Sequence, residues 1–154
     1  MTYSYDQPID DAASSANDIV SLYFPNAIQT SRFCRYDFYE LRESSVLLIE
    51  FKNRNLSLAY AEENGLYVEL SKYDALAEEA NRLSVLTHRR AVVLYLNALS
   101  DAHVCFNLTA MARPEFLHAR MNDMTHSEGA QVKKEKAVAL LYPASALFSR
   151  KITR

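Results

Sequence analysis

The sequence predicts a single α/β domain with an α+β mixed sheet, in the order helix, three strands, helix, two strands. Apolar residues recur at helical spacing over residues 10–24 and again over 71–83. Strand-like runs lie between these two helices and after the second one. The chain has 154 residues, and 49% of them are hydrophobic. That is enough for one core, so one domain over 1–154 is the simplest arrangement.

The N-terminal region is predicted to be loose over residues 1–9 and helical after them. Asp10 or Asp11 can cap a helix that runs to about Phe24, and Pro25 ends it. The apolar face of this helix consists of Ala12, Ala13, Ala16, Ile19, Val20 and Tyr23.

Three strands follow, and two of them form a hairpin. They are predicted at Ala27–Phe33, Arg35–Leu41 and Val46–Asn53. Residues 42–45 form a tight turn between the last two strands. If Glu43 and Ser44 are its loop, Arg42 pairs with Ser45, and Asp37 then pairs with Glu50. The turn has no Asn-Gly or Asp-Gly pair, so a register shifted by one residue stays open.

Side chains alternate along a strand, so this register gives the hairpin two different faces. An apolar face is expected to contain Tyr36, Phe38, Leu47, Ile49 and Phe51. The opposite face is expected to contain Arg35, Asp37, Tyr39, Glu50 and Lys52. Burying such a charged group would be costly unless it served a purpose.

After the hairpin, the sequence predicts a loop or an excursion over residues 54–66, ending at Gly65, and then a short strand, Leu66–Leu70. Ser71 is predicted to cap the second helix, with Asp74 in a capping-box position. The apolar stripe of this helix, Tyr73, Leu76, Ala77, Ala80 and Leu83, is interpreted as core.

The remaining elements follow the second helix. The runs Ala91–Leu96 and His103–Leu108 predict central strands covered on both faces. Further predictions are a short helix at Pro114–Met121, a surface loop over 122–136, a last strand at Ala137–Tyr142 and a short basic tail.

Composition and charge limit the function classes. The net charge is −2, but residues 113–154 carry 8 Lys/Arg against 4 Asp/Glu. This asymmetry fits either an anionic polymer bound at one end or an uneven solvated surface. Cys34 and Cys105 are expected to be free thiols, and no Cys/His spacing resembles a zinc site. No signal peptide and no apolar stretch near ~20 residues is found, so a cytoplasmic protein without a membrane partner is expected.

The chemistry-bearing motif is the acid-x-lysine run Glu50-Phe51-Lys52, with Asp37 across the hairpin. Two carboxylates on one face suit a hard divalent cation, and a nearby lysine suits an anionic substrate or a water. The alternative is a cross-strand salt bridge on a solvated face.

With this motif and the element order, the chain resembles the PD-(D/E)xK, or restriction-endonuclease-like, nuclease superfamily. It is also similar to small phage-encoded members, in which a segment like Val68–Tyr73 opens the next helix. The resemblance implies that Asp37 and Glu50 bind Mg²⁺ (or Mn²⁺), with the carbonyl of Phe51 as an extra ligand. It implies that Lys52 positions or activates the attacking water.

The chain departs from the family pattern at two points. Tyr36 stands where a proline often precedes the aspartate, and the first helix has no glutamate, so that only Asp18 remains as a substitute. The other candidates for an outer shell of the site are Arg54, Glu69 and Lys72. For Glu69, a favourable charge at a helix N-terminus explains the residue equally well.

Nucleic-acid contacts are predicted for a set of basic residues, although such residues also occur in ordinary solvated loops. They are Arg113, Arg120, Lys133 and Lys134, with Lys136 close by.

Taken together, the sequence favours a metal-dependent endonuclease that hydrolyses phosphodiester bonds, expected to be those of DNA, with a magnesium-activated water. It would act in the host cytoplasm if phage-encoded. A homodimer is one option, because many relatives dimerise to cut two strands. One alternative is a catalytically inactive nuclease-like domain that binds nucleic acid or a host or phage protein. A structural or interaction protein without a site is a third.

Overall fold

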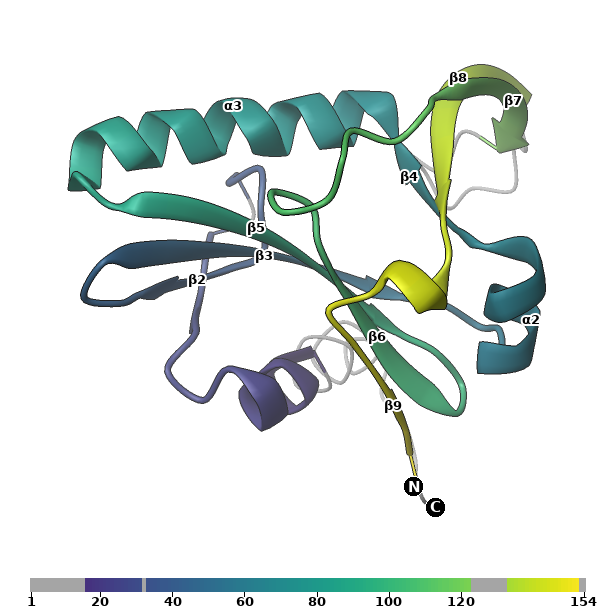
Figure 1. Ribbon diagram of the computed structural model, residues 1–154, viewed down its shortest axis with the longest axis horizontal. Helices are drawn as coiled ribbons and strands as arrows, with labels where there is room; N and C mark the ends of the chain where they lie inside the picture. Colours follow the sequence, from purple (N-terminus) through teal and green to yellow (C-terminus); the bar gives the residue numbers. More distant parts are fainter. Residues whose placement is uncertain (1–15, 32, 123–132, 153–154) are drawn as a thin grey trace, which may run out of the picture.

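The computed structural model describes residues 16–31, 33–122 and 133–152, and it is built around a six-stranded mixed sheet (Figure 1). The strands are β1 (Ile28–Gln29), β2 (Phe38–Leu41), β3 (Ser45–Asn53), β5 (Arg90–Ala98), β6 (Ala102–Asn107) and β9 (Phe148–Lys151). Their order across the sheet is β1-β2-β3-β5-β6-β9. Among the strands that the structure describes in this sheet, the central pair, β3 and β5, is parallel and the other pairs are antiparallel. A parallel pair needs a long crossover, and residues 54–89 provide it.

Helices cover both faces of this sheet, as expected for central strands that are apolar almost throughout. The long helix α3 (Leu70–Thr87) lies over one face, and the helical residues 16–23 lie under the other (Figure 1). On the α3 side, Leu76 packs into a cluster with Leu48 and Tyr95. On the other side, Val20 and Phe24 pack against Phe38, Leu47, Ile49 and Leu94.

The predicted hairpin register is confirmed. The N–H of Arg42 donates to the carbonyl of Ser45 at 2.8 Å, and β2 pairs with β3 from Leu41↔Val46 to Phe38↔Ile49. The paired residues end at Phe38↔Ile49, and the N–H of Asp37 donates to the carbonyl of Ile49 at 3.0 Å, so the predicted pairing of Asp37 with Glu50 is not part of this ladder. The pairing ends there because the chain before Phe38 leaves the regular strand.

A second, smaller sheet lies beside the first, in the order β4-β8-β7 (Figure 1). Its strands are β4 (Leu66–Glu69), β8 (Lys133–Leu141) and β7 (Leu117–Asn122). The short helix α2 (Leu58–Asn64) precedes β4, and a 3-10 turn, Pro143–Ser145, follows β8. Leu66 and Val68 on β4 and Ala139 and Leu141 on β8 belong to the same core cluster as α3.

Several predictions of local structure were wrong. Residues 54–66 are not only a loop, because Ser57 caps α2 by accepting a hydrogen bond from the N–H of Tyr60. Pro114–Met121 is not a helix but contains most of β7, which pairs with β8. Residues 133–136, assigned to the surface loop 122–136, belong to β8. Ala137–Tyr142 is not the last strand, because β9 follows and closes the sheet against β6.

Three smaller corrections concern caps and faces. Helix α3 begins at Leu70, so Ser71 does not cap it; Glu69 holds the N-cap position without a side-chain bond. Tyr36 packs with Leu48 on the α3 side, not beside Phe38, because regular alternation starts only at Phe38. The predicted first strand is only Ile28–Gln29. Predictions for residues 1–15 and for 123–132 lie outside the described residues.

Candidate functional site

The hairpin brings the Asp37 carboxylate against the backbone of β3. Asp37 Oδ2 accepts a hydrogen bond from the N–H of Phe51, with an N–O distance of 2.8 Å. Phe51 lies beyond the last β2–β3 pair, so this carboxylate replaces a missing strand partner. The negative charge of Asp37 also raises the pKa of Glu50, so the two carboxylates lie close enough to interact.

Glu50 is the buried member of the site, only 3% exposed. Its Oε1 lies 3.3 Å from Nζ of Lys72 and 3.9 Å from Nζ of Lys52. Its Oε2 is buried and has no hydrogen-bond partner among the described residues. Burial and, secondarily, Asp37 raise the pKa of Glu50 to about 7, although both lysines act to lower it. A buried carboxylate oxygen without a donor is unfavourable unless a cation compensates it.

Lys52 and Lys72 reach the site from different elements. Lys52 stands two residues after Glu50 on β3, on the same face, and its side chain is 45% exposed. Lys72 comes from the first turn of α3, and its Nζ also donates to the carbonyl of Arg35 at 3.2 Å. The sequence placed Lys72 only among outer-shell candidates, whereas it contacts Glu50 more closely than Lys52 does.

The guanidinium of Arg54 forms its hydrogen bonds with other residues of the protein. Its Nε donates to Asn97 Oδ1 at 2.8 Å, and its Nη2 donates to the Tyr67 carbonyl and the Tyr95 hydroxyl at 2.6 Å each. The guanidinium also lies over the Tyr67 ring, 4.3 Å from its centroid. This network ties the end of β3 to β5 and β4, and no sequence signal indicated it.

The other two outer-shell candidates, Asp18 and Glu69, lie away from Asp37 and Glu50 and form neither a hydrogen bond nor an ion pair with these carboxylates in the described structure. Glu69 Oε1 pairs with Lys136 Nζ at 3.2 Å, across β4 and β8. Asp18 is exposed on the helical residues 16–23, which pack on the face of the sheet opposite to α3.

The basic residues predicted to contact nucleic acid belong to or flank the second sheet. Arg113 lies 3.5 Å from Asp74 and stacks over the Tyr73 ring. Arg120 is exposed on β7 opposite Glu135. Lys133 and Lys134 begin β8, and their side chains lie outside the described residues.

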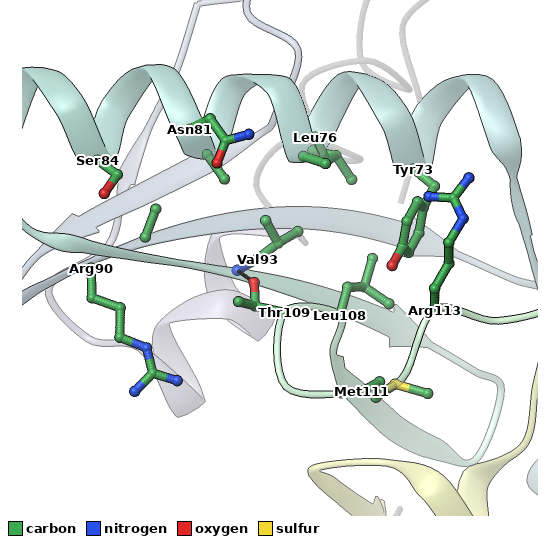
Figure 2. A pocket seen from close by; sticks show the side chains of 13 residues that line it. Tyr73, Leu76, Asn81, Ser84, Arg90, Val93, Leu108, Thr109, Met111 and Arg113 are labelled. Carbon is green, nitrogen blue, oxygen red and sulfur yellow. Dashed lines mark hydrogen bonds between the residues drawn. The ribbon is translucent and has the colours of Figure 1, made fainter.

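Two hollows formed by described residues are lined by other parts of the chain, and neither includes Asp37 or Glu50. A cavity of about 450 Å³ lies between α3, the start of β5 and residues 108–113 (Figure 2). Leu76 and Asn81 line it from α3, and Leu108 and Met111 line it from the opposite wall (Figure 2). A polar hollow of about 510 Å³ lies beyond Lys52, lined by Asn53, Arg54, Asn55, Leu99 and Ser100.

The side chains near Glu50 limit the kind of metal ion that this site could bind. Within the described part of the chain, no three His, Cys, Asp or Glu side chains gather in one place. A cation here would therefore depend on two carboxylates, Asp37 and Glu50, with backbone and water oxygens. Oxygen ligands of this kind suit Mg²⁺, which keeps several waters. The unpaired buried Oε2 of Glu50 is the observation that fits a cation.

Comparison with known proteins supports the fold. No protein-family model and no curated protein matches the sequence. Among solved structures, the chain is similar to Hjc, a Holliday junction resolvase from the archaeal hyperthermophile Archaeoglobus fulgidus. The two share 15% sequence identity with a TM-score of 0.52, over 88% of this chain and 90% of the resolvase. The chain therefore has a restriction-endonuclease-like fold with a mixed sheet. Separately, no helix in the described residues is long and apolar enough to span a membrane.

Proposed function

We propose that this protein is a metal-dependent nuclease that hydrolyses phosphodiester bonds of DNA. The observation that carries the proposal is the buried, unpartnered Oε2 of Glu50 beside Asp37, on a restriction-endonuclease-like fold. The fold alone does not identify an activity, because one fold hosts many functions. The proposal therefore depends on the site.

Asp37 and Glu50 would hold the cation, Mg²⁺ or Mn²⁺. Asp37 is already oriented by the Phe51 N–H, and its second oxygen, Oδ1, accepts no hydrogen bond from a described residue. The N–H and C=O of one strand residue point to the same side, so the Phe51 carbonyl faces the edge where Asp37 lies. That carbonyl is the proposed third protein ligand. A bound divalent cation neutralises phosphate charge and lowers the pKa of a water.

Lys52 is the proposed partner of the attacking water and the scissile phosphate. Its Nζ is 3.9 Å from Glu50, longer than the 3.3 Å of Lys72, and its side chain is more exposed. An ammonium group in this position can donate to a water and stabilise negative charge that develops on phosphate oxygens.

DNA is the proposed substrate because the similar solved structure is a Holliday junction resolvase. Arg113, Arg120, Lys133 and Lys134 would bind the phosphate backbone away from the cut. A homodimer would allow two strands to be cut, and this belongs to the proposal as well.

The test is cleavage of supercoiled plasmid and of a synthetic four-way DNA junction with Mg²⁺ or Mn²⁺. We expect cleavage by the parent protein and its loss in Asp37→Ala and Lys52→Ala. Arg82→Ala, which removes an exposed ion pair with Glu79 on α3, is the matched control and should cleave normally. A parent protein that cleaves neither substrate with either metal would contradict the proposal.

A second candidate is a catalytically silent nuclease-like domain that binds nucleic acid or another protein. The two lysines that already compensate Glu50, and its 3% exposure, favour this reading. In that case, all the variants above would leave DNA intact, and Asp37→Ala would shift its mobility as the parent does.

A further inference from the structure

Two lysines contact the same oxygen of Glu50, and they are not equivalent. Lys72 lies nearer than Lys52, at 3.3 Å against 3.9 Å, and its side chain is less exposed, at 33% against 45%. Lys72 also has a second acceptor, whereas among the described residues the ammonium of Lys52 contacts Glu50 alone. The two side chains therefore suit different tasks.

The second acceptor of Lys72 is the carbonyl of Arg35, at 3.2 Å. Arg35 precedes Asp37 by two residues. One ammonium group from α3 thus joins Glu50 on β3 to the segment that carries the other carboxylate. The connection joins three separate segments of the chain, residues 35–37, β3 and α3.

Other contacts attach the same segment to α3. The guanidinium of Arg35 pairs with Glu78 on α3, with an Nη1–Oε2 distance of 2.9 Å. Tyr36 is 8% exposed and packs in the core cluster that contains Leu76. On its other side, Asp37 accepts the Phe51 N–H. Residues 35–37 are therefore held between α3 and β3.

From these contacts we infer that Lys72 is a positioning residue, which fixes the Asp37 carboxylate relative to that of Glu50. The value of this for metal binding rests on the proposed function, but the positioning itself does not. Removing the ammonium releases the Arg35 carbonyl and one contact of Glu50 at once. Asp37 then loses its alignment with the Phe51 N–H.

The test measures hydrogen exchange of the Phe51 amide in the metal-free protein, together with calorimetric titration by Mn²⁺ alone. The variants are Lys72→Gln and Lys72→Arg. The matched control is Lys136→Gln, which removes a lysine–glutamate pair of nearly the same length, 3.2 Å, from Glu69. The Leu48 amide, in the same strand, reports any general loss of stability.

We expect Lys72→Gln to lower Phe51 protection about tenfold relative to Leu48 and to weaken Mn²⁺ binding at least fivefold. Lys72→Arg keeps the positive charge and has enough N–H donors for both acceptors, so it should retain Phe51 protection and Mn²⁺ affinity within about threefold. The control should leave both unchanged. Unchanged Phe51 protection in Lys72→Gln, or tighter Mn²⁺ binding, overturns the inference.

The two proposals fail in different ways. If the parent protein neither binds Mn²⁺ nor cuts DNA, but Phe51 protection still falls in Lys72→Gln, the nuclease assignment is wrong and the positioning role stands. If the parent binds Mn²⁺ and cuts DNA while Phe51 protection is the same in Lys72→Gln, the nuclease assignment stands and the positioning role of Lys72 is wrong.

Discussion

The carboxylate of Asp37 accepts the backbone N–H of Phe51 at 2.8 Å, just where the β2–β3 ladder ends. The side chain thus substitutes for a strand partner and is held beside Glu50 without any metal. This relationship separates two properties of Asp37 that mutation can distinguish, its charge and its ability to accept a hydrogen bond.

Asp37→Asn is predicted to remove function while keeping the fold. The amide oxygen still accepts the Phe51 N–H, but the charge that would hold a cation is lost. We expect at least ~100-fold slower DNA cleavage, since metal and electrostatic contributions of this size are common. Stability without metal should stay the same or rise, because Asp37 no longer opposes the ionisation of Glu50. Cleavage assays and urea unfolding check this, with the half-exposed Asp74→Asn as control.

The stability of the metal-free protein is predicted to depend on pH through Glu50. Its folded pKa of about 7 lies above the ordinary value of 4.5, so the folded state holds the proton more tightly. The contribution of Glu50 to the free energy of unfolding is therefore fully present below about pH 4.5. It is lost as the pH rises through about 7, and it amounts to at most about 3 kcal/mol. Urea unfolding with a chelator at pH 5 and pH 8 measures the difference. Glu50→Gln should remove this part of the slope, and an identical slope in the variant would refute the prediction.

Lys52→Met is predicted to separate binding from chemistry. Its long, half-exposed contact with Glu50 contributes little stability, since exposed ion pairs are typically worth about 0–1 kcal/mol. We expect Mn²⁺ affinity and DNA affinity within about threefold of the parent, with kcat reduced at least ~100-fold. Lys151→Met, an exposed lysine on β9, is the control. A loss of metal binding equal to the loss of rate would place Lys52 in a structural role.

Arg54→Met is predicted to affect stability more than activity. The change leaves the buried Asn97 and Tyr95 without their guanidinium partner. We expect the free energy of unfolding to fall by about 2–4 kcal/mol, because buried polar groups lose charge-assisted hydrogen bonds. Arg54→Lys should recover little of it, since one ammonium cannot reproduce the planar fork. Chemical denaturation measures this, and a stable but inactive Arg54→Met would instead place Arg54 at the substrate.

The sequence predicted the hairpin well because the hairpin follows local rules. A two-residue loop fixes the register, and alternation then assigns the side chains near the turn, such as Phe38 and Ile49, to one face. Tyr36 departs from this assignment because it lies before the regular strand. The local rule therefore held from the turn to Phe38 and failed before it, although Asp37 still lies close enough to Glu50 to raise its pKa.

The missed elements depend on pairing between distant segments or on signals that were present but weak. Leu117–Asn122 alternates His118 and Arg120 with apolar residues, a strand signal that Pro114 obscured as an apparent helix start. Helix α2 has its own signals, Ser57 at the N-cap and Gly65 after its last residue. The Lys72–Glu50 contact has no local signal at all, because it exists only once α3 lies across β3.

The parallel β3–β5 pair has a consequence for the order of folding. The β2–β3 hairpin closes a two-residue loop, whereas β5 joins β3 only after residues 54–89 have crossed over the sheet. Closing a long loop costs more entropy, so we expect the hairpin to form earlier. Asp37 and Glu50 would then take their positions while both are still exposed to water. The contact of Lys72 with Glu50 would form only when α3 packs on the sheet. Pulsed hydrogen exchange during refolding checks this sequence of events, and simultaneous protection of Leu47, whose N–H faces β2, and Leu76 would contradict it.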